Sequence, residues 1–261
     1  MPKPTVLITG ASTGIGAVYA DRFAKRGHDL VLVARDRAKL EDLAARLRKE
    51  SGVAVDVLQA DLTDTRQLGK VETLLKTDSR IGILVNNAGA SLAGTFIEQT
   101  TEATAQLIAL NTIAVTRLAG AVAPRFVTEG KGDIINIASV VGLAPELGLS
   151  VYGATKAFVL FLSQGLQLEL GPKGVYVQAV LPAATRTDIW AKAGRNVDEI
   201  PGVMEVEELV DAALVGFDLR ETVTIPPLPD AGQWNDFDNA RRAMMPGFGQ
   251  ERAAARYRKA A

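Results

Sequence analysis

The sequence predicts an α/β fold, in which a single doubly wound domain holds a parallel β-sheet flanked by helices on both faces. Short apolar runs alternate with longer amphipathic stretches along the chain, which is the pattern of right-handed βαβ units. Several of the short runs are apolar nearly throughout, as strands buried on both faces should be. The 261 residues are enough to bury a sizeable core, and no linker or internal repeat divides them.

The expected strands and helices follow from this alternation. We predict strands over residues 4–10, 28–34, 53–59, 81–87, 132–138 and 174–180. We predict helices over about 14–26, 36–50, 64–77, 97–128, 151–170 and 205–219. Ligands of such sheets bind at the carboxyl ends of the strands, so the residues that directly follow each strand form the expected site.

The C-terminal part differs from the rest. The prolines of TIPPLPDAGQW argue against a helix over residues 224–234. The end, QERAAARYRKAA (250–261), is basic and helix-prone, and we expect a solvated helix or a frayed terminus there, with a nucleic-acid or partner contact as the alternative. We therefore predict one domain over residues 1–261, which includes a C-terminal extension over about 226–261.

Composition excludes several classes of function. The net charge of −1 provides no field that would attract nucleic acid or an anionic membrane, so neither is an expected partner. The chain has no cysteine and one histidine, His28, which precedes a strand at the end opposite the site; a metal site or histidine-based triad is not expected. The apolar segment 105–124 contains Asn111 and Arg117 and is typical of a buried or interface helix rather than a membrane span. The start shows no secretory signal pattern, so we expect a cytoplasmic protein.

The turn after the first strand is glycine-rich. Gly10, Gly14 and Gly16 lie between an apolar strand and an amphipathic helix. Glycines let a backbone turn tightly and approach a pyrophosphate, whose charge is met by the helix N-terminus. The spacing is G-x-x-x-G-x-G, and a mere tight turn is the alternative to a phosphate site.

The end of the second strand bears on which dinucleotide would bind. Sites that prefer NAD commonly carry an acidic residue there for the ribose 2′-hydroxyl, whereas this chain has Ala34 and then Arg35. An arginine suits a 2′-phosphate through fork-shaped hydrogen bonding, so NADP(H) is favoured. The neighbouring Asp36 keeps NAD(H) possible, and a solvated Arg35 without a ligand is the alternative.

A tyrosine and a lysine stand one helical turn apart in SVYGATKAFVLFLS. Tyr152 and Lys156 share a helix face because residues four apart do so. A nearby ammonium stabilises phenolate and should lower the tyrosine pKa toward neutrality. The pair therefore predicts an acid/base for a carbonyl or alcohol oxygen, unless it is a chance pair at an exposed helix start.

Taken together, these motifs resemble the classical short-chain dehydrogenases/reductases, over about residues 4–225. The motifs that carry the resemblance are TGASTGIG, Asp61-Leu62, Asn86-Asn87-Ala88-Gly89, Asn111, Ser139 and the Tyr152-Gly-Ala-Thr-Lys156 segment, in family order and spacing. The resemblance implies a Rossmann fold. The family often has Pro-Gly after the sixth strand, where this chain has Pro182-Ala183. Alanine restricts the backbone somewhat, which leaves the nicotinamide contact open.

The resemblance also implies roles for individual residues. Hydride would pass between nicotinamide and the substrate carbonyl, Tyr152 would protonate its oxygen, and Ser139 would donate a hydrogen bond to it. Lys156 would lower the Tyr152 pKa and hold the nicotinamide ribose. Asn111, through its amide or its backbone, would hold a proton-relaying water; a helix kink or cap is the alternative. The implied cofactor-binding residues are Gly10, Ser12, Thr13, Gly14, Ile15, Gly16, Arg35, Asp61, Leu62, Asn87, Ala88, Gly89, Tyr152, Lys156, Pro182, Ala183, Thr185 and Thr187.

The residues expected around the substrate are mainly apolar, which suits an uncharged, apolar ketone or aldehyde. They are Ala90, Leu92, Val140, Leu143, Leu147, Leu149 and Trp190. Residues from about 184 to 205 resemble the family's lid, which could order over bound substrate. The helices over 97–128 and 151–170 are too apolar for a free surface, so a homodimer or homotetramer is expected.

Several functions compete on this evidence. The leading hypothesis is an NADP(H)-dependent carbonyl reductase or alcohol dehydrogenase. An NAD-linked dehydrogenase of a polyol or hydroxy acid is the alternative enzyme, and a dinucleotide-sensing regulator without turnover is an alternative of another class. A nucleic-acid-binding module is a third class that rests on the basic tail alone.

Overall fold

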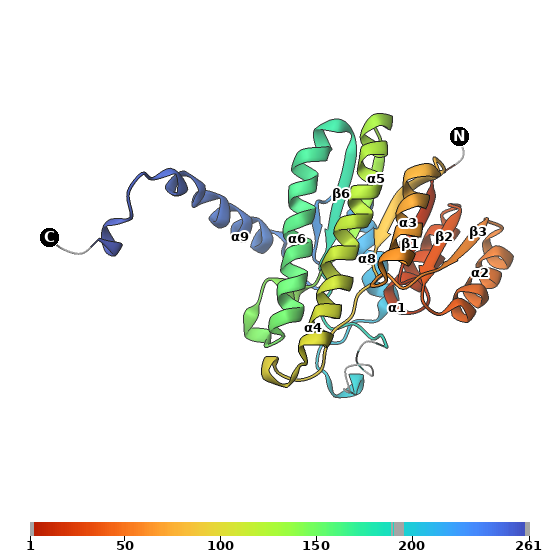
Figure 1. The fold of residues 1–261 in the computed structure, drawn as a ribbon, viewed down its shortest axis with the longest axis horizontal. Helices are drawn as coiled ribbons and strands as arrows, with labels where there is room; N and C mark the ends of the chain where they lie inside the picture. The colour runs from red at the N-terminus through yellow and green to blue at the C-terminus, as the bar shows by residue number, and fades with distance from the viewer. Residues whose placement is uncertain (1–2, 189, 191–195, 259–261) are drawn as a thin grey trace. The chain divides into compact units, whose positions relative to one another are not determined.

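Within the residues that the computed structural model describes (3–188, 190 and 196–258), seven parallel strands form one sheet. Their order is β3-β2-β1-β4-β5-β6-β7, with helices on both faces (Figure 1). The chain divides into two compact units, Met1–Pro226 and Pro227–Ala261, and the sheet belongs to the first. The predicted doubly wound α/β fold is confirmed.

The elements lie close to their predicted positions. The strands are β1 (Thr5–Thr9), β2 (Leu30–Ala34), β3 (Val55–Gln59), β4 (Ile81–Asn86), β5 (Gly132–Ile137), β6 (Val175–Val180) and β7 (Val223–Thr224). The helices are α1 (Gly14–Lys25), α2 (Arg37–Ser51), α3 (Thr65–Thr77), α4 (Thr101–Ile108), α5 (Val115–Glu129), α6 (Ser150–Leu170), α8 (Val206–Asp218) and α9 (Ala231–Ala243).

Burial on both faces explains the apolar strands. In β1, Val6 and Ile8 pack into the core beneath α1, α2 and α8, whereas Leu7 packs into the core beneath α3 and α5. Successive side chains of a strand point to opposite faces, so each face receives every second residue. Alpha helices α5 and α6 lie side by side over the second face (Figure 1).

The strand order reverses beside β1, which pairs with β2 on one edge and β4 on the other. The helices that follow β1 and β4 pack on opposite faces of the sheet, α1 against the first core and α5 against the second, and such sheets bind ligands in the crevice at the carboxyl ends of the strands beside this switch point. The glycine turn follows β1, and Asn87 follows β4. Chain topology alone therefore brings these two motifs together.

Three predictions of secondary structure are wrong in part. The single helix expected over 97–128 is a 3₁₀ turn (Phe96–Glu98), α4, a π-helical segment (Ala109–Ala114) and α5. The prolines near residue 226 do not prevent α9, because they precede Asp230, whose carboxylate caps the helix by accepting from the Gly232 N–H at 2.7 Å. The described residues of the basic end, where a solvated helix or a frayed terminus was expected, are exposed and form a 3₁₀ turn at Ala255–Tyr257. Strand β7 was also missed, since two residues are too short to show a period.

By length and composition, the stretch Thr101–Glu129 could cross a membrane. Half of its most apolar window is buried inside the protein. Helix α5 contacts α3, β4 and β5, and its side chains fill the second core. Packing in the core therefore explains why this stretch is apolar, in agreement with the buried helix that its Asn111 and Arg117 indicated.

Candidate active site

The glycine turn after β1 is shaped for a close approach. Gly10 and Gly14 have φ of 65° and 57°, which lie in the left-handed region that glycine adopts readily. A Cβ at Gly16 would lie 2.4 Å from the Gly10 carbonyl oxygen, so only glycine fits there. Thr13 begins α1 without a side-chain capping bond. The first N–H groups of α1 therefore remain suited to a phosphate.

Asn87 ties the loop after β4 to this turn. Its side-chain Nδ2 donates to the carbonyls of Thr9 (2.9 Å) and Gly10 (3.2 Å). In return, the hydroxyl oxygen of Thr9 accepts from the backbone N–H groups of Asn87 and Ala88. Thr9 was missed in the sequence, although a polar residue that ends an otherwise apolar strand was the available signal. The two loops are thus held as one wall of the crevice.

At the end of β2, the two charged residues differ in what they contact. The Asp36 carboxylate caps α2 by accepting from the Lys39 N–H at 3.1 Å. The Arg35 side chain is exposed, and no residue within the described part of the chain forms an ion pair or hydrogen bond with its guanidinium. The Arg35 carbonyl accepts from Gln59 Nε2 at 2.9 Å, which fixes the backbone. Arg35 is therefore available to an anion, whereas Asp36 already serves the helix.

Asp61 and Leu62 follow β3 as expected. The Asp61 carboxylate accepts from both the N–H and the hydroxyl of Thr63, which folds the chain into a turn. Leu62 is buried in the second core. This turn fixes the side of the crevice nearest β3.

Ser139, Tyr152 and Lys156 converge from β5 and α6. Ser139 directly follows β5, Tyr152 lies in the first turn of α6, and Lys156 lies one turn further along. The Ser139 side chain lies near enough to the Tyr152 phenol to lower its pKa. Lys156 Nζ lies 5.7 Å from the centroid of the Tyr152 ring and donates to the Ile137 carbonyl at 2.8 Å. The three residues predicted to be catalytic are therefore neighbours.

Burial governs the protonation of this cluster. It raises the pKa of Tyr152, and the nearby Ser139 side chain opposes that rise. It also lowers the pKa of Lys156 to about 8, because a low-dielectric setting disfavours the charged form of either group. The tyrosine pKa thus departs in the direction opposite to the sequence-based expectation, since desolvation outweighs the opposing effect of Ser139.

Asn111 lies in the π-helical segment and is 1% exposed. Its Oδ1 accepts from the Ala90 N–H, and its Nδ2 donates to the Ala90 carbonyl and to the Thr155 hydroxyl, each at 3.0 Å. The helix irregularity and the amide contacts therefore occur together, and π-helical segments are frequent at functional sites. The Asn111 side-chain amide is fully hydrogen-bonded to Ala90 and Thr155. The Asn111 backbone is therefore the group able to hold a water.

The loop after β6 closes the other side of the crevice. The Pro182 carbonyl accepts from the Ser139 hydroxyl at 3.2 Å, and the Ala183 carbonyl accepts from Thr185 Oγ1 at 3.0 Å. A Cβ built on Gly14 would lie 3.2 Å from Thr187 Cγ2. This contact places Thr187 against the phosphate turn, as a cofactor-binding residue requires.

The predicted substrate residues are less tightly gathered. Val140 and Leu143 lie in and beside the 3₁₀ turn that follows Ser139, and Leu149 immediately precedes α6. Trp190 donates from Nε1 to the Thr185 carbonyl at 2.7 Å. Leu147 is 56% exposed and forms no enclosed wall in this structure. Ala90 is held by Asn111, and Leu92 is half-buried.

The expected lid over about 184–205 lies only partly in the described structure, because residues 189 and 191–195 fall outside it. Its two ends are joined. Thr185 pairs with Met204 as an isolated β-bridge, and Arg186 forms ion pairs with Asp198 and Glu205 at 2.6 and 2.9 Å. These contacts fix where the segment leaves and rejoins the body.

Comparison with known proteins agrees with this geometry. The family model for short chain dehydrogenases matches residues 4–198. A solved short-chain dehydrogenase from Sphingobium yanoikuyae, in complex with NADPH, is 67% identical with a TM-score of 0.97, over 98% of this chain and 100% of that one. A bulky-bulky ketone specific alcohol dehydrogenase from Comamonas testosteroni is 60% identical with a TM-score of 0.92, over 98% and 99% of the two chains.

More distant relatives include very-long-chain 3-oxoacyl-CoA reductases. The very-long-chain 3-oxoacyl-CoA reductase of Rattus norvegicus is 35% identical over 222 residues, which are 83% of this chain and 70% of that protein. The match to the corresponding reductase-B of Danio rerio, also 35% identical, covers 75% of this chain and spans 63% of that protein's length.

Proposed function

This chain belongs to the short-chain dehydrogenase family and is an oxidoreductase of CH–OH and C=O groups. On this premise, we propose that it is an NADP(H)-dependent reductase of bulky, apolar ketones. The observation that carries the proposal is the convergence of Ser139, Tyr152 and Lys156 beside the glycine turn. In that cluster, Tyr152 would serve as the acid for a carbonyl oxygen held next to a bound dinucleotide. The dinucleotide supplies the hydride when it is bound.

The residues of the crevice fit NADP(H). The turn at Gly16 has no room for a side chain, and α1 starts without a side-chain cap; both suit a pyrophosphate. Arg35 is free for a 2′-phosphate, while Asp36, the residue that kept NAD(H) possible, is committed to capping α2. The Sphingobium relative, at 67% identity, was solved with NADPH, which supports the same preference here.

In the proposed reaction, the residues of this chain handle the proton. Burial keeps Tyr152 protonated at neutral pH, so its phenol can donate to the carbonyl oxygen. The Ser139 hydroxyl, which donates to the Pro182 carbonyl in this structure, would turn its proton to the substrate oxygen and stabilise the charge that develops there. Lys156, held by the Ile137 carbonyl, would fix the nicotinamide ribose.

A bulky ketone is the substrate class that the surroundings favour. The residues expected around it are apolar, and Leu147 is largely open to solvent. An uncharged substrate suits a site whose apolar walls carry few polar groups. The Comamonas relative, at 60% identity, is specific for bulky-bulky ketones, which supports this choice over a polyol or hydroxy acid.

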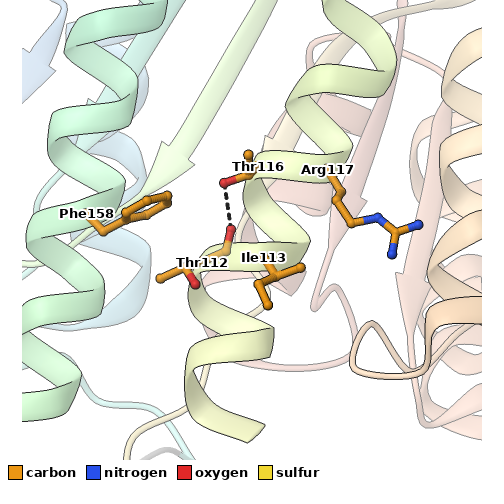
Figure 2. Close-up of a pocket in the computed structure, with 5 residues that line it drawn as sticks. All are labelled: Thr112, Ile113, Thr116, Arg117 and Phe158. Carbon is orange, nitrogen blue, oxygen red and sulfur yellow. Dashed lines mark hydrogen bonds between the residues drawn. The ribbon is translucent and has the colours of Figure 1, made fainter. Parts of the chain in front are cut away.

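We also propose that a second copy of the chain covers the face formed by α5 and α6. Large apolar side chains lie exposed there: Ile113 (51%), in the π-helical segment that leads into α5, and Phe158 (42%), Phe161 (74%) and Leu168 (77%) in α6. Between the two helices lies a groove of about 260 Å³, lined by Thr112, Ile113, Thr116, Arg117 and Phe158 (Figure 2). An exposed apolar face of this kind is typical of an interface. Sedimentation of the wild type and of Phe161→Glu tests this proposal, and a monomeric wild type would contradict it.

A cytoplasmic location is a further proposal, supported by a chain with no cysteine to oxidise. Fractionation of the native host cell would test it, and recovery of the protein with membranes or medium would contradict it.

The experiment that tests the proposed activity is a paired titration with NADPH and NADH, followed by nicotinamide absorbance in the presence of ketones. A phenyl ketone with a long alkyl arm, such as 1-phenylhexan-1-one, is compared with acetone. We expect tighter binding of NADPH and faster oxidation of NADPH with the bulky ketone. Binding without turnover of any ketone would favour the regulator, and binding of neither nucleotide would overturn the proposal.

A further inference from the structure

Thr155 occupies an unusual position between two residues of the site. It directly precedes Lys156 in α6 and is 3% exposed. Its hydroxyl donates to the Tyr152 carbonyl at 2.7 Å and accepts from Asn111 Nδ2 at 3.0 Å. A threonine hydroxyl has a single hydrogen. Because that hydrogen is committed to Tyr152, the oxygen can face Asn111 only as an acceptor.

The partner amide is fully used. Asn111 Oδ1 accepts from the Ala90 N–H, and one Nδ2 hydrogen goes to the Ala90 carbonyl. The other Nδ2 hydrogen has Thr155 as its acceptor. Asn111 is 1% exposed, so bulk water does not replace a lost partner. Removal of the Thr155 hydroxyl would leave a buried N–H unpaired, which is costly.

The amide also lies beside the catalytic lysine. A Cβ built on Gly89 would be 3.4 Å from both Asn111 Oδ1 and Lys156 Nζ. Asn111 belongs to a π-helical segment, in which i→i+5 bonds replace those of the α-helix. Its side chain ties this irregular segment to Ala90 and to Thr155.

Other threonines of the neighbouring helices behave differently. Thr116 and Thr128 each donate to a carbonyl one turn back in their own helix, which is a local bond with little wider effect. Thr155 makes such a local bond and, in addition, joins α6 to the π-helical segment. Through Asn111, it is connected to Ala90 after β4.

We propose that Thr155 is a positioning residue for hydride and proton transfer. Its hydroxyl fixes the Asn111 amide against Ala90. It also holds the first turn of α6, which carries Tyr152, in a fixed position relative to Asn111 and Ala90. The inference rests on the proposed function. Thr155 touches no reacting atom, so it acts through Asn111 and Tyr152. The mechanism predicts a loss of catalytic rate without a comparable loss of cofactor affinity.

The test compares Thr155→Val, which keeps the shape but removes the hydroxyl, with Thr155→Ser, which keeps the hydroxyl. Thr128→Val is the matched control, because it removes an exposed, local helix bond. Each protein is assayed for thermal unfolding, for NADPH affinity, and for kcat, KM and solvent isotope effect with 1-phenylhexan-1-one. If Thr155→Val does not fold, Thr155→Ala against Thr155→Ser gives the same comparison.

We expect Thr155→Val to bind NADPH within about twofold of wild type and to lose about tenfold in kcat, the loss that one unpaired buried N–H would cause if felt in the transition state. Its solvent isotope effect should rise, and Thr155→Ser should restore both values. A Thr155→Val enzyme with wild-type kcat, equal losses in Val and Ser, or a loss of kcat that only follows a loss of cofactor binding would overturn the inference. A wild type without ketone reduction would instead overturn the proposed function.

Discussion

Replacing Gly16 by alanine adds one methyl group at the most crowded point of the predicted cofactor site. The new Cβ would lie 2.4 Å from the Gly10 carbonyl oxygen and 2.5 Å from Asn87 Nδ2. Both distances are about 1 Å shorter than van der Waals contact at ~3.5 Å. Neither neighbour can yield freely, because Gly10 holds the turn and Asn87 Nδ2 is bonded to the carbonyls of Thr9 and Gly10.

The size of the effect follows from these contacts. Overpacking of a tight site costs about 1–3 kcal/mol, and disturbing the Asn87 hydrogen bonds adds about 1 kcal/mol. The better helix propensity of alanine returns about 0.5–1 kcal/mol. A net destabilisation of about 2–3 kcal/mol lowers Tm by about 5–10 °C in a protein of this size. NADPH affinity should fall by at least about tenfold, since the displaced carbonyl and amide border the phosphate turn.

The matched control is Gly69→Ala. Gly69 also lies inside a helix, α3, but a Cβ there would meet nothing within 4 Å. This variant should gain about 0.5–1 kcal/mol and keep its NADPH affinity. Thermal unfolding and NADPH fluorescence titration measure both effects. A Gly16→Ala protein with wild-type Tm and affinity, or equal losses in the two variants, would refute the reasoning.

Three further predictions concern the chemistry. Tyr152→Phe should lose ketone reduction at least about 10²-fold, the scale of one general acid, while NADPH titration stays near wild type; appreciable turnover would exclude Tyr152 as the acid. Arg35→Asp should weaken NADPH by about tenfold or more and spare NADH, because the lost charge pairs only with a 2′-phosphate; equal losses in the two titrations would remove Arg35 as the phosphate reader. Burial raises the pKa of Tyr152, so the initial rate of ketone reduction should be high at neutral pH, whereas the rate of alcohol oxidation should keep rising above pH ~8. A common pH optimum near neutrality for both directions would contradict this assignment.

The sequence predicted the sheet well because its strands are buried on both faces. An apolar run such as that around Val6, Leu7 and Ile8 cannot lie on a surface, and its length fits a strand. The prediction failed where local composition is ambiguous. Thr101–Glu129 is mostly apolar and helical in pattern despite Asn111 and Arg117, so nothing in its pattern marks the change to π-helical geometry at Ala109. Helix α9 was missed because the prolines were given more weight than the cap at Asp230.

The candidate site also contains residues that the sequence could predict and residues that it could not. Ser139, Tyr152 and Lys156 each follow a strand end or begin a helix, so their proximity follows from topology once the fold is known. The roles of Thr9 and Thr155 could not be predicted, because each depends on a hydrogen bond with a residue more than 40 positions away. The same limit applies to the Tyr152 pKa. The sequence identifies the neighbouring Lys156, whereas the desolvation that raises the Tyr152 pKa arises only when the chain packs.

The corrected pKa directions change what the cluster is suited to do. A proton donor for ketone reduction must hold its proton at the working pH, and burial secures this for Tyr152. Lys156, with a pKa of about 8, still carries its charge below that pH and can steady the negative charge as the phenol gives up its proton. Alcohol oxidation would need phenolate at the start, and raising the pH far enough to form it also discharges Lys156. At neutral pH the site therefore holds a protonated phenol beside a charged ammonium, which is the arrangement that the proposed ketone reduction requires.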